Sequence, residues 1–142
     1  MSAQSIAAIA ALAIGAGSAS AQTERDSGEY VSIVQLIAHP DRYDGKVVFL
    51  IAYATIRHEG DSLCMVPKAA SSKDCVWLRF DDGPYETEQD FVRYDRARAK
   101  WQQLSGKLIS VRGTFSKTDT GHFGMYSGGI GKISDVYPAP RK

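Results

Sequence analysis

The chain has 142 residues, of which 44% are hydrophobic, and its 17 basic and 16 acidic side chains leave a net charge of +1. This near-neutral charge argues against a dedicated nucleic-acid binder, whose phosphate contacts ordinarily need a basic excess, although it is compatible with a local basic face. Once an N-terminal leader is set aside, the remaining length fits one domain.

The N-terminus has the pattern of a cleavable secretory signal. Residues 6–17 are apolar or small, and Ala19-Ser20-Ala21 before Gln22 matches an A-x-A cleavage site. This apolar run is too short to span a bilayer, which needs about 20 residues. We therefore expect a signal peptide over 1–21, a mature start at Gln22 without a membrane span, and a periplasmic or secreted protein. Residues 1–5 lack Lys and Arg, so a start upstream of Met1 stays open, and a buried Ala-rich helix is the alternative.

Export determines how the two cysteines are interpreted. In an oxidising compartment, Cys64 and Cys75 are expected to form a disulfide. They flank the polar, small-residue loop 68–74, which the bond would clamp. The alternatives are a redox pair, which favours C-x-x-C spacing, and a metal site, which needs further Cys or His ligands at a suitable spacing.

The N-terminal half of the mature chain predicts one helix and three strands. Residues 22–29 are charged and lack apolar side chains, so we expect a flexible lead-in before a barrel domain over 30–138 and a tail over 139–142. Ser32 followed by Gln35 is a capping box, which predicts a short helix over 33–38 that Pro40 ends. Turn residues then separate strands that are predicted at 46–56, 62–66 and 75–80.

The C-terminal half predicts a longer helix and two or three strands. Thr87 with Asp90 resembles a second capping box, and Gly106 is expected to cap the helix C-terminus. Apolar residues at spacings of three and four predict a buried stripe: Phe91, Tyr94, Ala97, Trp101 and Leu104. Strands are predicted at 107–116, 122–126 and 131–136, with a bend at Gly128 and Gly129.

A repeated pattern links the two halves: residues 44–52 return as 105–113, each a glycine turn, a lysine and a β-branched run. The element order resembles the OB-fold. The stretch 36–48 and the Gly-Lys strand at 106–115 also resemble OB-like domains of uncharacterised exported bacterial proteins. The resemblance covers nearly all of the mature chain and implies no particular activity. It implies a mainly β barrel of five or six strands, a short N-terminal helix and one helix between the third and fourth strands.

The OB-fold resemblance implies a ligand face on the second and third barrel strands and the flanking loops. Trp77 and Arg79, with Tyr53 or Arg57 nearby, are the candidates there, because an aromatic ring and a cation can stack on a base, a sugar or a peptide side chain. The alternative is structural: Trp77 packs under the disulfide loop or the N-terminal helix, and Arg79 pairs with Asp81 or Asp82.

Three other patterns carry less weight. The acidic run 81–90 has the ligand type that calcium prefers, but it lacks the EF-hand spacing, and its later members suit a helix N-terminus. His122 and Tyr126 resemble the haem-attachment motif of periplasmic haem chaperones, but that motif follows the last strand, whereas residues 128–136 come after it here. His39 and His58, like His122, have no recognisable nucleophile context. No metal or cofactor is predicted.

The sequence therefore favours an exported, non-catalytic binding module whose partner is a protein or a peptide. The second hypothesis is a polyanion, such as single-stranded nucleic acid or an acidic envelope polymer, bound along Arg57, Arg79 and Arg112. An undetected hydrolase, with the histidines converging in space, is the third. The sequence does not indicate an oligomeric state.

Overall fold

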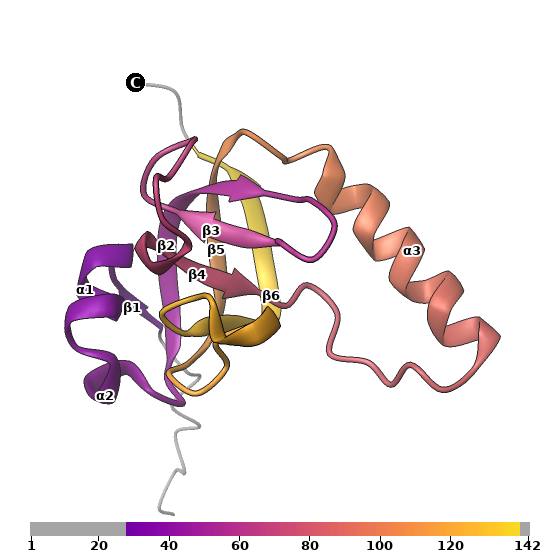
Figure 1. Ribbon diagram of the computed structural model, residues 1–142, viewed down its shortest axis with the longest axis horizontal. Helices are drawn as coiled ribbons and strands as arrows, with labels where there is room; N and C mark the ends of the chain where they lie inside the picture. Colours follow the sequence, from indigo (N-terminus) through magenta and orange to yellow (C-terminus); the bar gives the residue numbers. More distant parts are fainter. Residues whose placement is uncertain (1–27, 140–142) are drawn as a thin grey trace, which may run out of the picture.

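The computed structural model describes residues 28–139, and the predicted signal peptide, most of the lead-in and residues 140–142 lie outside them. The described part is mainly β: β2, β3, β4, β6 and β5 form a ring that the β2–β5 pairing closes, and β1 is an extra strand on β2. This is the predicted OB-fold-like barrel. Two short helices lie on one side of the barrel and the long helix α3 stands on the opposite side (Figure 1).

The N-terminal helix is confirmed residue for residue. Strand β1 (Glu29–Tyr30) pairs in parallel with β2, so Glu29, which was expected in the lead-in, is part of the sheet. Helix α1 (Ile33–Ala38) carries both hydrogen bonds of the capping box between Ser32 and Gln35. Pro40 ends α1 as predicted but also begins a four-residue helix, α2 (Pro40–Tyr43), because proline suits the first helical position.

The next strands are shorter than predicted but occur in the expected places. They are β2 (Val47–Thr55), β3 (Ser62–Cys64) and β4 (Cys75–Leu78), with the 3-10 turn η1 (Ser72–Asp74) before β4. Cys64 and Cys75 are directly opposite each other in the antiparallel β3–β4 pair, and they form the predicted disulfide. The bond closes the loop between these strands at its base.

The C-terminal half contains α3 (Glu88–Gln102), β5 (Leu108–Ser116), the 3-10 turn η2 (His122–Gly124) and β6 (Gly129–Pro138). The second capping box is present, but the helix ends at Gln102 with Gln103 as its cap, so Gly106 is not the helix cap. The strand predicted at 122–126 is wrong. Gly121, Phe123 and Gly124 all have positive φ, which breaks an extended conformation.

The repeated pattern has a structural explanation in the β2–β5 pair. Gly45 and Gly106, which precede the two strands, have φ values of 75° and 78°, a region that glycine enters without steric cost. The Gly45 N–H donates to Phe115 O at 2.9 Å, and the Gly106 N–H donates to Ala54 O at 2.7 Å. Each glycine therefore fixes the end of the opposite strand, and the two copies of the pattern are the two paired strands of one antiparallel ladder.

Inward-facing residues alternate along the strands and fill the barrel. Val48, Leu50 and Ala52 from β2 are fully buried, and they form one hydrophobic cluster with Leu78 of β4. This cluster also contains Val76, Ile109, Val111, Phe115 and Ile130. Trp101 at the end of α3 belongs to it too, so the C-terminal end of α3 is fixed to the barrel.

Candidate functional site

The predicted ligand face is covered by the chain itself. Trp77 points outward from β4, but its ring lies 5.2 Å from that of Tyr126, centroid to centroid, and both pack with the disulfide. Tyr126 is only 1% exposed. A Cβ at Gly121 would lie 2.5 Å from the Trp77 ring, so the β5–β6 loop (117–128) passes directly over this face. The structural alternative for Trp77 thus holds in part: it packs beside the disulfide, under this loop.

The five predicted face residues do not form one surface. Trp77 and Arg79 line the same cleft, whereas Arg57 borders a separate hollow beside the disulfide. Tyr53 is half-buried on β2, opposite Cys64. Arg112 lies on the β2–β5 wall, where its guanidinium carbon is 5.4 Å from the centre of the Phe49 ring.

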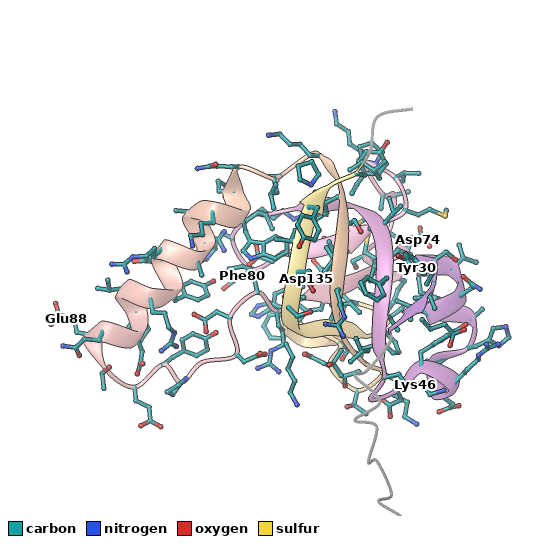
Figure 2. All side chains as sticks on the ribbon, turned by 180° about the vertical axis from the view of Figure 1, so that it is seen from behind. Tyr30, Lys46, Asp74, Phe80, Glu88 and Asp135 are labelled. Atoms are coloured by element: carbon teal, nitrogen blue, oxygen red, sulfur yellow. A yellow bond between two sulfur atoms is a disulfide. The ribbon has the colours of Figure 1, made fainter. Side chains whose placement is uncertain are left out.

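The cleft that Trp77 and Arg79 share lies between the barrel and α3, and its volume is about 510 Å³. This is within the range of roughly 300–1,000 Å³ that is typical of small-molecule sites. Its walls are mainly aromatic: Trp77, Phe80, Tyr85, Phe91 and Tyr94. Figure 2 shows Phe80 between the barrel and α3, and Glu88 at the helix end that is far from the barrel.

Aromatic contacts build the cleft from three segments. The Phe80 ring, just after β4, stacks on Tyr94 of α3 at 5.4 Å and lies 6.1 Å from Trp101. Tyr85, on the connection between β4 and α3, meets Tyr94 edge-on at 5.6 Å. Offset and edge-on arrangements of this kind are favourable for aromatic pairs. The rings therefore hold α3 at a fixed distance from the barrel.

Phe91 is the most exposed aromatic residue of the cleft. The periodicity placed Phe91 on the buried stripe of α3, but its side chain is 53% exposed, whereas Trp101 on the same stripe is 7% exposed. The helix diverges from the barrel toward its N-terminus (Figure 1), and Phe91 belongs to the first turn of that helix. An exposed aromatic residue that rims a concave apolar site is typical of a binding surface.

The connection from β4 to α3, residues 79–87, is referred to below as the strap. Arg93 of α3 holds it through two hydrogen bonds, to Asp81 Oδ2 at 3.1 Å and to the Pro84 carbonyl at 2.6 Å. Within α3, Arg93 also donates to Asp90 Oδ1 at 2.7 Å. The Tyr85 hydroxyl also donates to the Asp81 carbonyl at 2.6 Å. These bonds fix the outer wall of the cleft before any ligand arrives.

Asp61 is the buried charge of the cleft, and sequence reasoning did not single it out. It is 5% exposed and accepts from Arg98 Nη1 at 3.0 Å and from the Arg57 N–H at 3.1 Å. Burial raises the pKa of this carboxyl above its usual value, and the attraction of Arg98 offsets only part of that effect. The Glu-Gly-Asp turn pattern at 59–61 gave no sign that this acid would be buried.

Arg79 and Arg112, two of the three arginines of the polyanion hypothesis, are ion-paired. Arg79 lies 3.3 Å from Asp119 and 4.0 Å from Asp82, so the predicted pairing with Asp82 is found. Arg112 lies 3.7 Å from Asp135. These arginines therefore do not form the continuous basic track that a polyanion would need.

Two of the three histidines approach one another. His58 and His122 each place Nε2 near a different oxygen of Glu59, at 3.7 and 3.6 Å, while His39 lies at the junction of α1 and α2. Within residues 28–139, no group of three or more His, Cys, Asp or Glu is arranged to hold a metal ion. No helix of that range is long and apolar enough to cross a membrane.

Comparisons with known proteins give little information about function. No protein family matches the chain, and no curated protein does. A crystal structure assigned to an aspartyl-tRNA synthetase from Leishmania major Friedlin is similar, with a TM-score of 0.42 and 10% sequence identity over 82% of this chain. This chain spans only 22% of that protein. A similarity at this level is no argument for a shared activity.

Proposed function

We propose that this protein is an exported, non-catalytic binding module that holds an apolar side chain of a protein or peptide partner in the cleft between β4 and α3. One observation carries the proposal: five aromatic residues line a single open cleft, and Phe91 at its rim is exposed. Burying one large apolar side chain contributes roughly 1.5–3 kcal/mol, and aromatic pockets are where interface energy concentrates.

The rigidity of the cleft supports this proposal. Arg93 and Tyr85 hold the strap, and Arg98 and Trp101 hold the helix, so little ordering remains to be done when a ligand binds. Preorganised sites lose less conformational entropy on binding. A mainly apolar wall with paired charges also favours an uncharged side chain over a free ion.

A polyanion ligand is disfavoured by the ion pairs of Arg79 and Arg112. The salt dependence of the affinity distinguishes the polyanion from the apolar side chain. A polyanion complex weakens steeply as the ionic strength rises, and an apolar contact does not. Little change in affinity between about 50 and 200 mM salt would support the cleft, whereas a drop of a hundredfold or more would support a polyanion site.

The proposal places the protein in the periplasm or outside the cell, after removal of residues 1–21. The Cys64–Cys75 disulfide supports this location, because disulfides persist in oxidising compartments. Mass spectrometry of the exported protein tests it directly. The expected N-terminus is Gln22, and retention of residues 1–21 would contradict the proposal.

A peptide selection tests the function itself. Random peptides displayed on phage are selected on the immobilised domain, and the enriched sequences are expected to share one aromatic or large aliphatic anchor. Enrichment of acidic peptides without such an anchor, or of no peptides at all, would contradict an apolar cleft as the site.

A further inference from the structure

Phe123 is presented to solvent in an unusual way. Its side chain is 89% exposed, the largest value among the exposed large hydrophobic residues of the described chain. Its backbone has φ 51° and ψ 24°, a left-handed conformation that costs energy for a residue with a side chain. Gly121 and Gly124 on either side both have φ 66°. The chain therefore holds an aromatic residue outward at the tip of a tight turn.

The base of this turn is rigid. Tyr126 is buried against the disulfide and Trp77, and its N–H donates to the Thr120 carbonyl at 3.0 Å. Lys73 Nζ, from the turn that precedes Cys75, donates to the Gly124 carbonyl at 2.8 Å. Phe123 is thus a fixed projection rather than the end of a loose loop, and a fixed anchor loses little entropy on binding.

The projection and the aromatic cleft are neighbours. Gly121, two residues before Phe123, lies against the Trp77 ring, and Trp77 is also a wall of the cleft. Asp119 of the same loop pairs with Arg79, another residue of the cleft. One region of the surface therefore carries both an aromatic projection and an aromatic hollow, and an isologous two-fold interface requires that kind of self-complementary surface.

The charges around the two features are also complementary. Lys73 and His122 lie beside the projection; His122 is charged only when protonated and lies 3.6 Å from the Glu59 carboxylate, which leaves Lys73 as the unmatched positive charge there. Beside the cleft, the strap and the first turn of α3 carry exposed acids: Asp82, Glu86 and Glu88. A partner molecule turned by a two-fold rotation would bring each basic group toward the acids of the other copy, and such complementarity favours one docking orientation.

We propose that two copies of this chain form a symmetric dimer in which Phe123 of each copy occupies the aromatic cleft of the other. This rests on the proposed function, because it takes the cleft to be a site for apolar side chains. The occupant of the cleft is then Phe123 of a second copy. A partner peptide must displace it, so ligand binding and self-association compete.

Sedimentation and mixing experiments test the dimer. Wild-type residues 22–142 are expected to show a concentration-dependent dimer, and Phe123→Ala and Phe91→Ala are each expected to weaken it about tenfold or more. Met125→Ala, on the same loop and 42% exposed, is the matched control and should leave the dissociation constant within about twofold.

Mixing the two weakened variants gives the sharper result. A heterodimer of Phe123→Ala with Phe91→Ala retains one intact contact, from the Phe123 of the second variant to the cleft of the first. Its dissociation constant is expected to lie between those of the wild type and of either variant alone. A wild type that stays monomeric, a Phe123→Ala dimer as tight as the wild type, or no gain on mixing would each overturn the inference.

These failures are distinguishable from failure of the proposed function. If the wild type is monomeric but Phe91→Ala still loses a selected peptide, the dimer is wrong and the cleft remains the site. If the peptide binds Phe91→Ala as well as it binds the wild type, the site assignment itself is wrong.

Discussion

Arg98 of α3 donates a hydrogen bond at 3.0 Å to the buried carboxylate of Asp61, which lies at the β2–β3 hairpin. The same carboxylate accepts from the Arg57 N–H, so one acid ties the hairpin to the helix across the inner end of the cleft. The position of α3, and with it the width of the cleft, depends on this contact and on Trp101.

The first prediction concerns the pH dependence of this contact. Because burial raises the pKa of Asp61 in the folded protein, the folded state binds a proton more tightly than the unfolded chain. The contribution of Asp61 to the free energy of unfolding therefore falls as the pH rises from about 4 through the folded pKa. Asp61→Asn keeps an acceptor and removes the titration, so its stability relative to the wild type should increase over that pH window. Urea unfolding at pH 3.5 and pH 7 measures the change, and a difference independent of pH would contradict it.

The second prediction has the opposite sign and concerns the start of α3. Hydrogen bonds from the N–H groups of Thr87 and Glu86 lower the pKa of Asp90 to about 2. Because the pKa is lower in the folded protein, the ionised carboxylate stabilises the fold at pH values above about 4, its unfolded pKa. This stabilisation is lost as the pH falls toward 2. Asp90→Asn should remove this acid-sensitive contribution to the free energy of unfolding. The variant and the wild type should therefore converge in stability near pH 2.

A matched substitution tests the other half of this capping box. Thr87→Ala is expected to cost about 1 kcal/mol at pH 7, because the Asp90 N–H loses its acceptor. Thermal unfolding of both variants gives the comparison. Equal acid sensitivity in Asp90→Asn and the wild type would show that this carboxylate contributes nothing.

The third prediction concerns the disulfide. Cys64 and Cys75 are 11 positions apart in sequence, and cross-linking a loop of this size stabilises a protein by about 3 kcal/mol. The Cys64→Ala, Cys75→Ala double variant should lose stability of this order. It should also show faster amide exchange in the turn at Lys73, because this turn loses its closure. Chemically reduced wild type is the control and should match it; a loss below about 1 kcal/mol would contradict the role assigned to the bond.

Local patterns in the sequence predicted the elements well. The capping box at Ser32 predicted the first residue of α1. The Gly-Lys patterns that begin at Gly45 and Gly106 predicted β2 and β5, two of the three long strands of the barrel. Each of these depends on neighbours in the chain, which is why sequence patterns reveal them. The same patterns missed the turn at Phe123, because the loop is held by contacts with residues distant in sequence, such as the bond from Lys73 Nζ to the Gly124 carbonyl, and not by the Phe123 side chain.

The candidate site was predicted only in part, for a related reason. Trp77 and Arg79 are indeed cleft residues, but Phe91 was assigned to the core. Periodicity shows that a helix has an apolar face; it does not show how much of that face the rest of the chain covers. The angle at which α3 leaves the barrel is set by Asp61, Phe80 and Arg98, which are distant in sequence, and no local pattern reports it.

The affinity of one selected peptide for two neighbouring helix variants tests the central claim most directly. Phe91 and Val92 are similarly exposed, at 53% and 51%, but only Phe91 lines the cleft. Titration calorimetry should show that Phe91→Ala weakens the peptide about tenfold or more, whereas Val92→Ala changes its dissociation constant less than about twofold. Equal affinities of the wild type and Phe91→Ala would contradict the cleft as the binding site.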